Sequence, residues 1–294
     1  MKKYPNFICI GSAKAGTTTL YDVLKDHPDV YLPPIKETHF FDDPKYWNRG
    51  IEFYQEEYFS GVQGEKIIGE MTPSYIYFDD VPKRIFDSLG KDIKFVLMLR
   101  NPVTRALSHY KMHVSRGNET ISAKEAFETE ASRLAEADYQ TRARISFIDR
   151  GYYAAQLKRW LEFFPFENFH IVIFEEYIKD KANTYFDIEE FLGISHVDLN
   201  TEQRSNYTGI PRHRWIDHVL YRSTLIQKVS KVFMPSEKIR KKFKMWLKNK
   251  NTKVGQLEFN LQISEAEIFD KYFKKDIAEL ETLLGRDLDL WKYS

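Results

Sequence analysis

The sequence predicts an α/β fold, a single domain in which helices flank a central parallel sheet that carries a P-loop-like phosphate-binding loop. Short apolar runs of strand length alternate with longer amphipathic patterns, which is typical of repeated βαβ units. A loop with two glycines follows the first apolar run and opens a helix. The 294 residues, of which 43% are hydrophobic, suffice for one substantial core, so one domain over 1–294 is expected.

The predicted elements follow in order along the chain. Strands are expected at residues 7–10, 67–69, 94–99 and 170–174. Helices are expected at residues 17–25, 81–89, 153–164 and 179–192, the last stopped by a glycine. Asn101 can cap a further helix that opens at Pro102, where the missing N–H costs nothing. Ser264 caps a terminal helix to residue 284, with Glu267 at the capping-box position and Gly285 as its stop.

The region 200–260 has weaker periodicity and is expected to cover the acceptor or the cofactor. Within it, the stretch 228–253 is rich in Lys and Arg, and only Glu237 opposes them. This stretch could dock an anionic acceptor. It could equally be a solvated helical face that turns residues 245–247 inward.

Composition excludes several classes of protein. The 44 Lys and Arg residues nearly balance the 43 Asp and Glu residues, which argues against a nucleic-acid partner, so any anion site must be local. Cys9 is the one cysteine and lies in an apolar run, where a buried thiol is expected. That run stops at Gly11, too short for a signal peptide, and no run reaches the ~18 apolar residues of a membrane helix. We expect a soluble protein without an integral membrane segment, cytoplasmic if the sequence is complete; its oligomeric state stays open.

The first loop has the pattern of a phosphate cradle. Residues 11–18 read Gly-Ser-Ala-Lys-Ala-Gly-Thr-Thr between a strand and a helix, where free N–H groups and the helix dipole hold a phosphate. The P-loop of nucleotide triphosphatases places a lysine directly after its second glycine, whereas this chain has Thr17 there and Lys14 inside the loop. The Lys14 ammonium could therefore neutralise a bound oxygen without a metal. A glycine-bearing turn without a ligand is the alternative.

A second pattern follows the strand at 94–99. Arg100 leaves the strand end with a guanidinium fork suited to a phosphate, and Ser108 presents a hydroxyl from the second turn of the capped helix. Either residue alone is more often an ordinary surface or packing residue. Combined with the first loop, they predict a nucleotide with phosphates at two positions.

These motifs resemble those of the sulfotransferases that use 3'-phosphoadenosine-5'-phosphosulfate (PAPS). The sequence Lys-x-Gly-Thr-Thr resembles their 5'-phosphosulfate loop, and the segment from Phe95 to Tyr110 resembles their 3'-phosphate site. The resemblance implies that PAPS is the sulfuryl donor, that 3'-phosphoadenosine-5'-phosphate (PAP) is its product, and that no metal is required. The donor-binding residues implied are Lys14, Ala15, Gly16, Thr17, Thr18, Arg100 and Ser108.

A third segment, Lys-Glu-Thr-His-Phe-Phe-Asp at 36–42, is most similar to the heparan sulfate glucosaminyl sulfotransferases and their bacterial relatives. The resemblance implies that Glu37 takes the acceptor's proton, that His39 orients Glu37, and that Lys14, with Lys36 nearby, stabilises the departing phosphate. The expected reaction is direct in-line transfer to a small-molecule or carbohydrate acceptor. A hydroxyl is the favoured acceptor group, and an amine stays open as the alternative. Without the other motifs, Lys36 and Glu37 would be a solvated pair and His39 a packing residue.

Looser resemblances extend over most of the chain. The heparan enzymes carry a lysine after the glutamate of the segment 69–75, but this chain has Met71, which weakens the case for a polyanionic acceptor. Arg212 could close over the 3'-phosphate as a basic loop does in relatives. Tyr153 and Trp160 are expected to be core aromatics rather than adenine contacts.

Two other functions stay open. A P-loop-type kinase or nucleotide triphosphatase would share the loop and the sheet, but it needs the loop lysine and a strand-end Asp for Mg²⁺, and Glu70 and Arg100 occupy those strand ends. A non-catalytic nucleotide-binding protein would tolerate replacement of Glu37 without functional loss.

Overall fold

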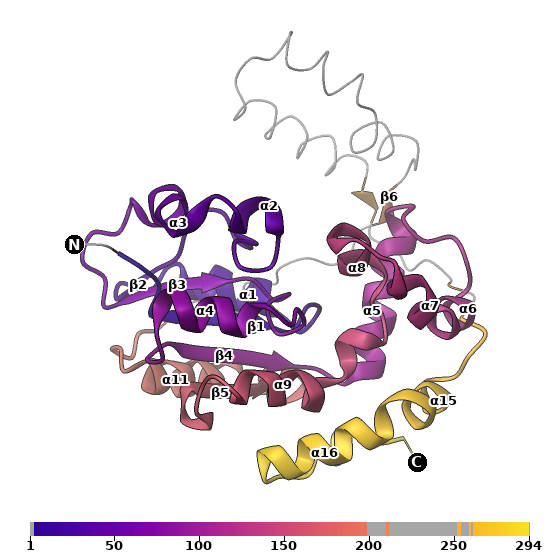
Figure 1. Cartoon of the computed structure of the whole chain (residues 1–294). Coiled ribbons are helices and arrows are strands. Elements are labelled where there is room, and N and C mark those ends of the chain that lie inside the picture. The colour runs from indigo at the N-terminus through magenta and orange to yellow at the C-terminus, as the bar shows by residue number, and fades with distance from the viewer. Residues whose placement is uncertain (1–2, 199–209, 212–251, 254–258, 260, 294) are drawn as a thin grey trace.

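The computed structural model describes residues 3–198, 210–211, 252–253, 259 and 261–293. At its centre lies a parallel sheet of five strands in the order β2-β3-β1-β4-β5 (Figure 1). Its strands are β1 (Phe7–Gly11), β2 (Val30–Tyr31), β3 (Ile67–Met71), β4 (Lys94–Leu99) and β5 (Phe169–Ile173). A separate antiparallel pair joins β6 (Ile210–Pro211) to β7 (Thr252–Lys253). The predicted α/β class is confirmed.

The apolar runs form the strands because they are buried on both faces of the sheet. Every residue of β1 is buried, and so is all of β4 beyond its first residue. Two expected boundaries were wrong. The strand β3 continues to Met71, and Phe174 begins a short helix instead of ending β5. The two-residue strand β2 was not predicted, because its apolar run is too short to show a period.

Helices cover both faces of the sheet. One face packs on α1 (Thr17–Leu24) and α11 (Lys181–Leu192), and the buried thiol of Cys9 lies in this layer, as predicted. The opposite face packs on α3 (Gly50–Phe59), α4 (Val81–Leu89), α5 (Pro102–Ser115) and α9 (Tyr153–Leu161). The short helix α2 (Pro44–Trp47) packs with the second of these layers, and α10 (Phe174–Tyr177) packs with the first. The helix predicted for 153–164 ends at Leu161, so its last turn was wrong.

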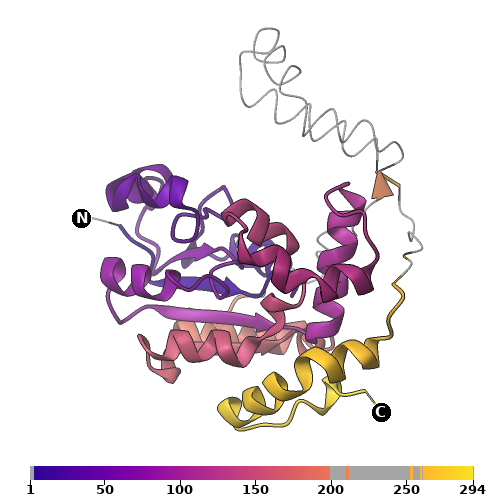
Figure 2. The same ribbon diagram turned by 45° about the vertical axis from the view of Figure 1, so that its right-hand side comes forward.

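Several helices gather beyond the carboxyl ends of the strands. They are α5, α6 (Ala123–Glu128), α7 (Glu130–Ala135) and α8 (Tyr139–Ile145), as both ribbon views show (Figures 1 and 2). A short helical turn, η1 (Asp149–Gly151), joins them to α9, and η2 (Phe166–Asn168) precedes β5. The last helices, α15 (Glu265–Ile268) and α16 (Lys274–Leu284), run past α9 to the short turn η4 (Asp289–Trp291) (Figure 2).

Helix ends follow the predicted signals. The Asn101 side chain accepts hydrogen bonds from the N–H groups of Val103 (3.0 Å) and Thr104 (3.2 Å), which caps α5. Ser264 and Glu267 form the expected capping box, and Gly285 ends α16 in the left-handed conformation. Between them, the segment Phe269–Phe273 is a π-helical turn, so the terminal helix is not uniformly α-helical. The helix expected at 179–192 begins two residues later than predicted, after Asp180 caps it.

Among the described residues, none of the helices is both long and apolar enough to cross a membrane. The basic stretch 228–253 lies outside the described residues, apart from the β7 backbone at 252–253. The expected roles of that stretch therefore stay predictions.

Candidate active site

The loops after β1 and β4 meet at the point where the strand order reverses. In open parallel sheets, ligands bind in the crevice at this point, outside the carboxyl ends of the strands. The N–H of Ser12 donates to the carbonyl of Met98 (2.6 Å), and the Arg100 guanidinium donates to the carbonyl of Lys14 (3.1 Å). The two predicted phosphate motifs are therefore joined directly.

The first loop needs its second glycine for two reasons. Gly16 has a φ of 89°, in the left-handed region, and a Cβ there would lie 3.0 Å from the ring of Phe174. Gly16 also precedes the first residue of α1, Thr17. The first N–H groups of a helix have no partner within the helix, so Thr17 and Thr18 can offer theirs to an anion. The loop has the conformation of a phosphate cradle.

Lys14 lies in the loop between the two motifs. Its ammonium is 3.7 Å from the sulfur of Met112 on α5. Burial, together with the charges of Arg116 and Arg100, lowers the pKa of Lys14 to about 8 against the opposing effect of Glu37. The side chain is thus partly desolvated within a cationic group, a setting in which an anionic ligand would be strongly attracted.

Arg100 and Ser108 flank the cradle on the side of α5. The Arg100 Nε donates to the hydroxyl of Thr104 (3.0 Å), and its guanidinium lies 4.9 Å from the ring centre of Phe174. Thr104, Ser108 and Met112 are spaced four residues apart, so they share one face of α5. Since Thr104 bonds Arg100 and Met112 contacts Lys14, Ser108 lies on the face of α5 that borders the loop.

Glu37 sits in a turn at the carboxyl edge of β3. Its backbone N–H donates to the carbonyl of Met71 (3.1 Å), and its φ is 65°. The Glu37 side chain is 40% exposed, and one carboxylate oxygen is 2.5 Å from the Lys36 ammonium. The Glu37 carboxylate is therefore accessible from solvent while it pairs with Lys36.

His39 links Glu37 to a second carboxylate. Its Nε2 is 3.8 Å from the Glu37 carboxylate, and its Nδ1 is 3.2 Å from the carboxylate of Asp42. Burial lowers the pKa of His39, but the hydrogen bond and charge of Asp42, with the charges of Glu37 and Glu70, raise it above its usual value. The hydroxyl of Tyr139 lies 3.3 Å from Nδ1. The imidazole is therefore oriented from one side and faces Glu37 on the other.

Three of these neighbours carry no predicted role. Asp42 was within the recognised segment, and its spacing of three residues from His39 was the available signal. Ser74 donates to Asp42, and Tyr139 reaches His39 from α8. No local pattern announces either contact, because each depends on how distant segments pack.

A buried carboxylate, that of Glu130, holds the backbone segment 147–149. Glu130 on α7 accepts the backbone N–H groups of Phe147 (2.8 Å), Ile148 (2.8 Å) and Asp149 (2.7 Å). Asp149 in turn accepts the hydroxyl of Tyr77 (2.7 Å), and the guanidinium of the next residue, Arg150, lies over the Tyr77 ring at 4.3 Å. Glu130 thus fixes a segment that would otherwise have unpaired N–H groups.

The remaining predicted residues fall into three groups. Tyr153 and Trp160 are buried core aromatics, as expected, and the Tyr153 hydroxyl donates to the Arg100 carbonyl (2.9 Å). Met71 is buried as well. Arg212 lies outside the described residues. Among the described side chains, no group of three or more His, Cys, Asp or Glu is arranged to hold a metal ion.

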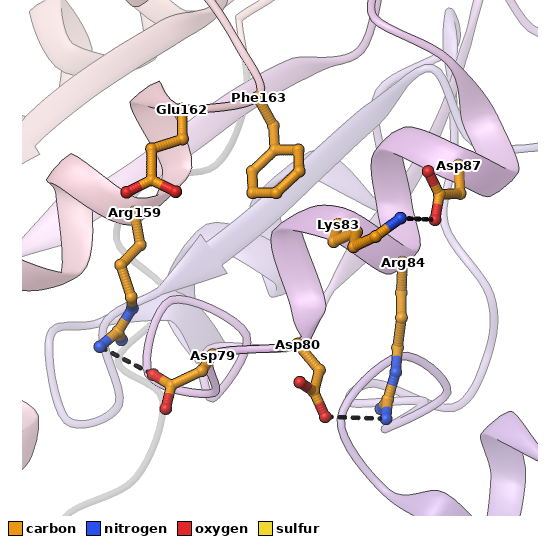
Figure 3. Close-up of a pocket in the computed structure, with 8 residues that line it drawn as sticks. All are labelled: Asp79, Asp80, Lys83, Arg84, Asp87, Arg159, Glu162 and Phe163. Atoms are coloured by element: carbon orange, nitrogen blue, oxygen red, sulfur yellow. Dashed lines mark hydrogen bonds and ion pairs between the residues drawn. The ribbon is translucent and has the colours of Figure 1, made fainter.

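A hollow of about 330 Å³ lies away from these residues, between α4 and α9 (Figure 3). Each cation in its lining is already paired with a carboxylate of the same hollow. The pairs are Arg159 with Asp79 (2.8 Å), Arg84 with Asp80 (3.1 Å) and Lys83 with Asp87 (2.6 Å). Because these charges compensate one another, the hollow offers little to a charged ligand.

The strand-end loop, the second cationic group and the nearby carboxylate are of the kind that group transferases of the P-loop-like α/β class carry. Comparison with known families gives the family: residues 5–281 match the sulfotransferase domain. The chain therefore belongs to the sulfotransferase family.

Individual relatives agree with this assignment. The chain is 31% identical over 195 residues to the human heparan sulfate glucosamine 3-O-sulfotransferase 5, a match that covers 66% of this chain and 55% of that protein. It is 32% identical over 212 residues to the mouse heparan sulfate glucosamine 3-O-sulfotransferase 3A1, covering 71% of this chain and 51% of that protein. The matched part thus spans about half the length of these relatives.

A solved structure is similar over nearly the whole chain. The sulfotransferase from Alicyclobacillus acidocaldarius is 28% identical, with a TM-score of 0.66, and the match covers 98% of this chain and 99% of that one. The predicted resemblance to sulfotransferases of the heparan sulfate and bacterial type is confirmed.

Proposed function

We propose that this chain transfers a sulfuryl group from PAPS to an acceptor hydroxyl, with an amine as the less favoured alternative. The single observation that carries the proposal is the direct contact between the two phosphate motifs, the Arg100 guanidinium donating to the Lys14 carbonyl at 3.1 Å. It brings two cationic groups to one crevice, with the Glu37 carboxylate close enough to affect the pKa of Lys14. A donor with phosphates at two positions fits this arrangement.

The donor would be held by the loop and by α5. In this proposal, the first N–H groups of α1 and the Lys14 ammonium bind the 5'-phosphosulfate, while Arg100 and Ser108 bind the 3'-phosphate. The proposed loop residues are Lys14, Ala15, Gly16, Thr17 and Thr18. We also propose that 1–294 form one sulfotransferase domain in which the region 200–260, including Arg212, covers the acceptor or the donor.

Glu37 would act as the general base. PAPS supplies an activated sulfuryl group on its 5'-phosphate. Glu37 takes the proton of the acceptor hydroxyl as its oxygen forms a bond to sulfur, and the bond between sulfur and the phosphate oxygen breaks in line. Lys14 and the loop N–H groups stabilise the charge that develops on the departing phosphate, while His39, held by Asp42, orients Glu37. No sulfated enzyme intermediate forms.

The acceptor is proposed to be a carbohydrate hydroxyl. The relatives named above are called heparan sulfate glucosamine sulfotransferases, which supports a sugar. Met71 supports one that is not a polyanion, because this position offers an anionic acceptor no cation and its side chain is buried.

Donor binding is tested first. Isothermal titration with PAP in EDTA should give tight binding, and ADP, which lacks the 3'-phosphate, should bind at least about tenfold more weakly because it leaves Arg100 and Ser108 without a ligand. Preference for magnesium-bound ATP would instead identify a phosphoryl-transferring enzyme.

The base is tested by substitution. Glu37→Gln should keep the PAP affinity but lose about 10²- to 10⁴-fold in sulfuryl transfer, measured with labelled PAPS and a panel of sugar acceptors. Full activity of this variant would place the base elsewhere. If wild-type protein binds PAP but transfers nothing to any acceptor, the non-catalytic alternative is favoured.

A further inference from the structure

A fully buried carboxylate lies beneath the turn that carries Glu37. Glu70, on β3, has no exposed surface. One of its oxygens accepts the hydroxyls of Thr38 and Thr72, both at 2.6 Å, and the other accepts the hydroxyl of Tyr54 on α3. A buried charge is costly unless it is hydrogen-bonded, so the hydrogen bonds from these three hydroxyls offset the free-energy cost of burying the Glu70 carboxylate. They also tie three separate segments to one point.

Thr38 is the residue through which this network reaches the site. It lies between Glu37 and His39, whose φ values are 65° and 53°. Both residues are therefore in the left-handed region, which is unfavourable for residues other than glycine. Such a conformation persists only where the surrounding structure enforces it. Thr38 itself is 3% exposed, and its hydroxyl oxygen also accepts the N–H of Phe40 (3.3 Å).

The direction of the Glu37 side chain depends on this turn. The Glu37 carboxylate is 40% exposed, and within the described part of the chain it pairs with Lys36 and His39, which both belong to the same segment. Three further bonds hold the backbone of the turn. The Glu37 N–H donates to the carbonyl of Met71 (3.1 Å), and the Asp43 N–H donates to the carbonyl of His39 (3.1 Å). The Tyr58 hydroxyl donates to the carbonyl of Thr38 (3.5 Å). The Thr38 hydroxyl is the contact that joins the turn to the buried carboxylate, so its loss would loosen the turn between its two left-handed residues and let both side chains shift together.

We propose that the hydrogen bond from Thr38 to Glu70 is the positioning contact for sulfuryl transfer, and that it sets the placement of Glu37 and His39 relative to the donor. The inference rests on the proposed function. Thr38 acts through its neighbours and touches neither donor nor acceptor. Since displacement of a catalytic group by about 1 Å can cost about 10²-fold in rate, one hydroxyl at this point has a large effect on turnover.

Two matched variants test the inference. Thr38→Val and Thr72→Val each remove one hydroxyl from the same oxygen of Glu70 and leave a side chain of nearly the same shape. We expect Thr38→Val to lower kcat about 10- to 100-fold, and Thr72→Val to lower it less than about threefold. The PAP affinity and the KM for PAPS should stay within about twofold of wild type in both, because the donor loop is untouched.

A rescue variant separates the hydroxyl from the rest of the side chain. Thr38→Ser keeps the hydroxyl and should restore most of kcat. Equal losses in Thr38→Val and Thr72→Val, or a parallel loss of PAP affinity in Thr38→Val, would mean that the network only stabilises the fold. If Thr38→Val does not fold, Thr38→Cys, a similar side chain with a weak donor, gives the same comparison. A wild-type protein without transfer activity refutes the proposed function, whereas an active wild type with an equally active Thr38→Val refutes the positioning role alone.

Discussion

Lys14 is the residue whose charge state should govern donor affinity. Burial and the neighbouring guanidinium groups lower its pKa to about 8, so the ammonium begins to lose its proton near neutral pH in the free protein. A bound phosphate would favour the charged form and raise this pKa again. Binding and protonation are therefore linked, and the affinity for an anion is highest where Lys14 is already charged.

The affinity for PAP should accordingly fall about tenfold between pH 7 and pH 9, since the unliganded protein must then take up a proton to bind. Titration calorimetry over this range measures it. In Lys14→Met the affinity should be low throughout and nearly independent of pH. A flat profile in the wild type would show that the Lys14 ammonium does not meet the ligand.

At the residue scale, the sequence predicted which residues lie at the candidate site better than it predicted the hydrogen bonds that hold them. Lys14, Glu37, Arg100 and Ser108 could be found because each stands in a contiguous motif next to an expected strand end, and the structure places them around one edge of the sheet. Their roles remain predictions. The support from Thr38 could not be predicted, because it depends on a carboxylate 32 residues away that becomes buried only when α3 packs over β3.

Among the elements, the segment from Phe147 to Asp149 depends on one side chain of α7. Glu130 satisfies three consecutive backbone N–H groups there, and the cost of leaving such buried groups unpaired is about 1–3 kcal/mol each. We expect Glu130→Ala to lower the free energy of unfolding by about 3 kcal/mol or more. Glu136→Ala, at the exposed end of the same helix, should change it by less than about 0.5 kcal/mol.

Denaturant unfolding followed by circular dichroism measures both variants. A Glu130→Ala variant as stable as wild type would mean that water replaces the carboxylate at these N–H groups. The short helices α6 to α8, from which this support comes, were not among the predicted elements. Each has six or seven residues, too few for a period of 3.6 to be recognised, whereas the longer helices α4 and α5 and the capping box of α15 carried clear signals.

For the molecule as a whole, the C-terminal turn η4 is tied to the carboxyl end of β4. Trp291 is fully buried; its indole N–H donates to Glu175 (2.9 Å), and its carbonyl accepts the side-chain amide of Asn101 (3.2 Å). Asn101 directly follows Arg100 and also donates its backbone N–H to Glu175 (3.0 Å). The last turn of the chain therefore braces the end of β4.

Trp291→Ala should cost about 3–5 kcal/mol of stability, the usual loss for a large buried aromatic, and should also weaken PAP binding, since the start of α5 loses a support. Leu290→Ala is the matched control: its side chain is 41% exposed, and we expect a change below about 0.5 kcal/mol. Thermal unfolding with and without PAP measures both effects. Unchanged PAP affinity in a destabilised Trp291→Ala variant would mean that the contact stabilises the fold and does not affect PAP binding.

The fold class could be predicted at this scale because the alternation of strand and helix patterns limits the arrangements of a single sheet. The acceptor could not be predicted, because no motif of the sequence specifies it. The order of the strands, with β1 between β3 and β4, likewise followed from no local pattern. It is nevertheless this order that brings the loops after β1 and β4 together.

The left-handed backbone conformation of Glu37 and His39 has a consequence for the evolution of this sequence. Glycine would relieve the backbone strain at either position, so the side chains proposed for the reaction are retained at a cost in folding free energy. Selection for durability alone would therefore favour their loss. A descendant released from the need to turn over substrate would be expected to become more heat-resistant as it lost activity, and glycine at these two positions would mark that change.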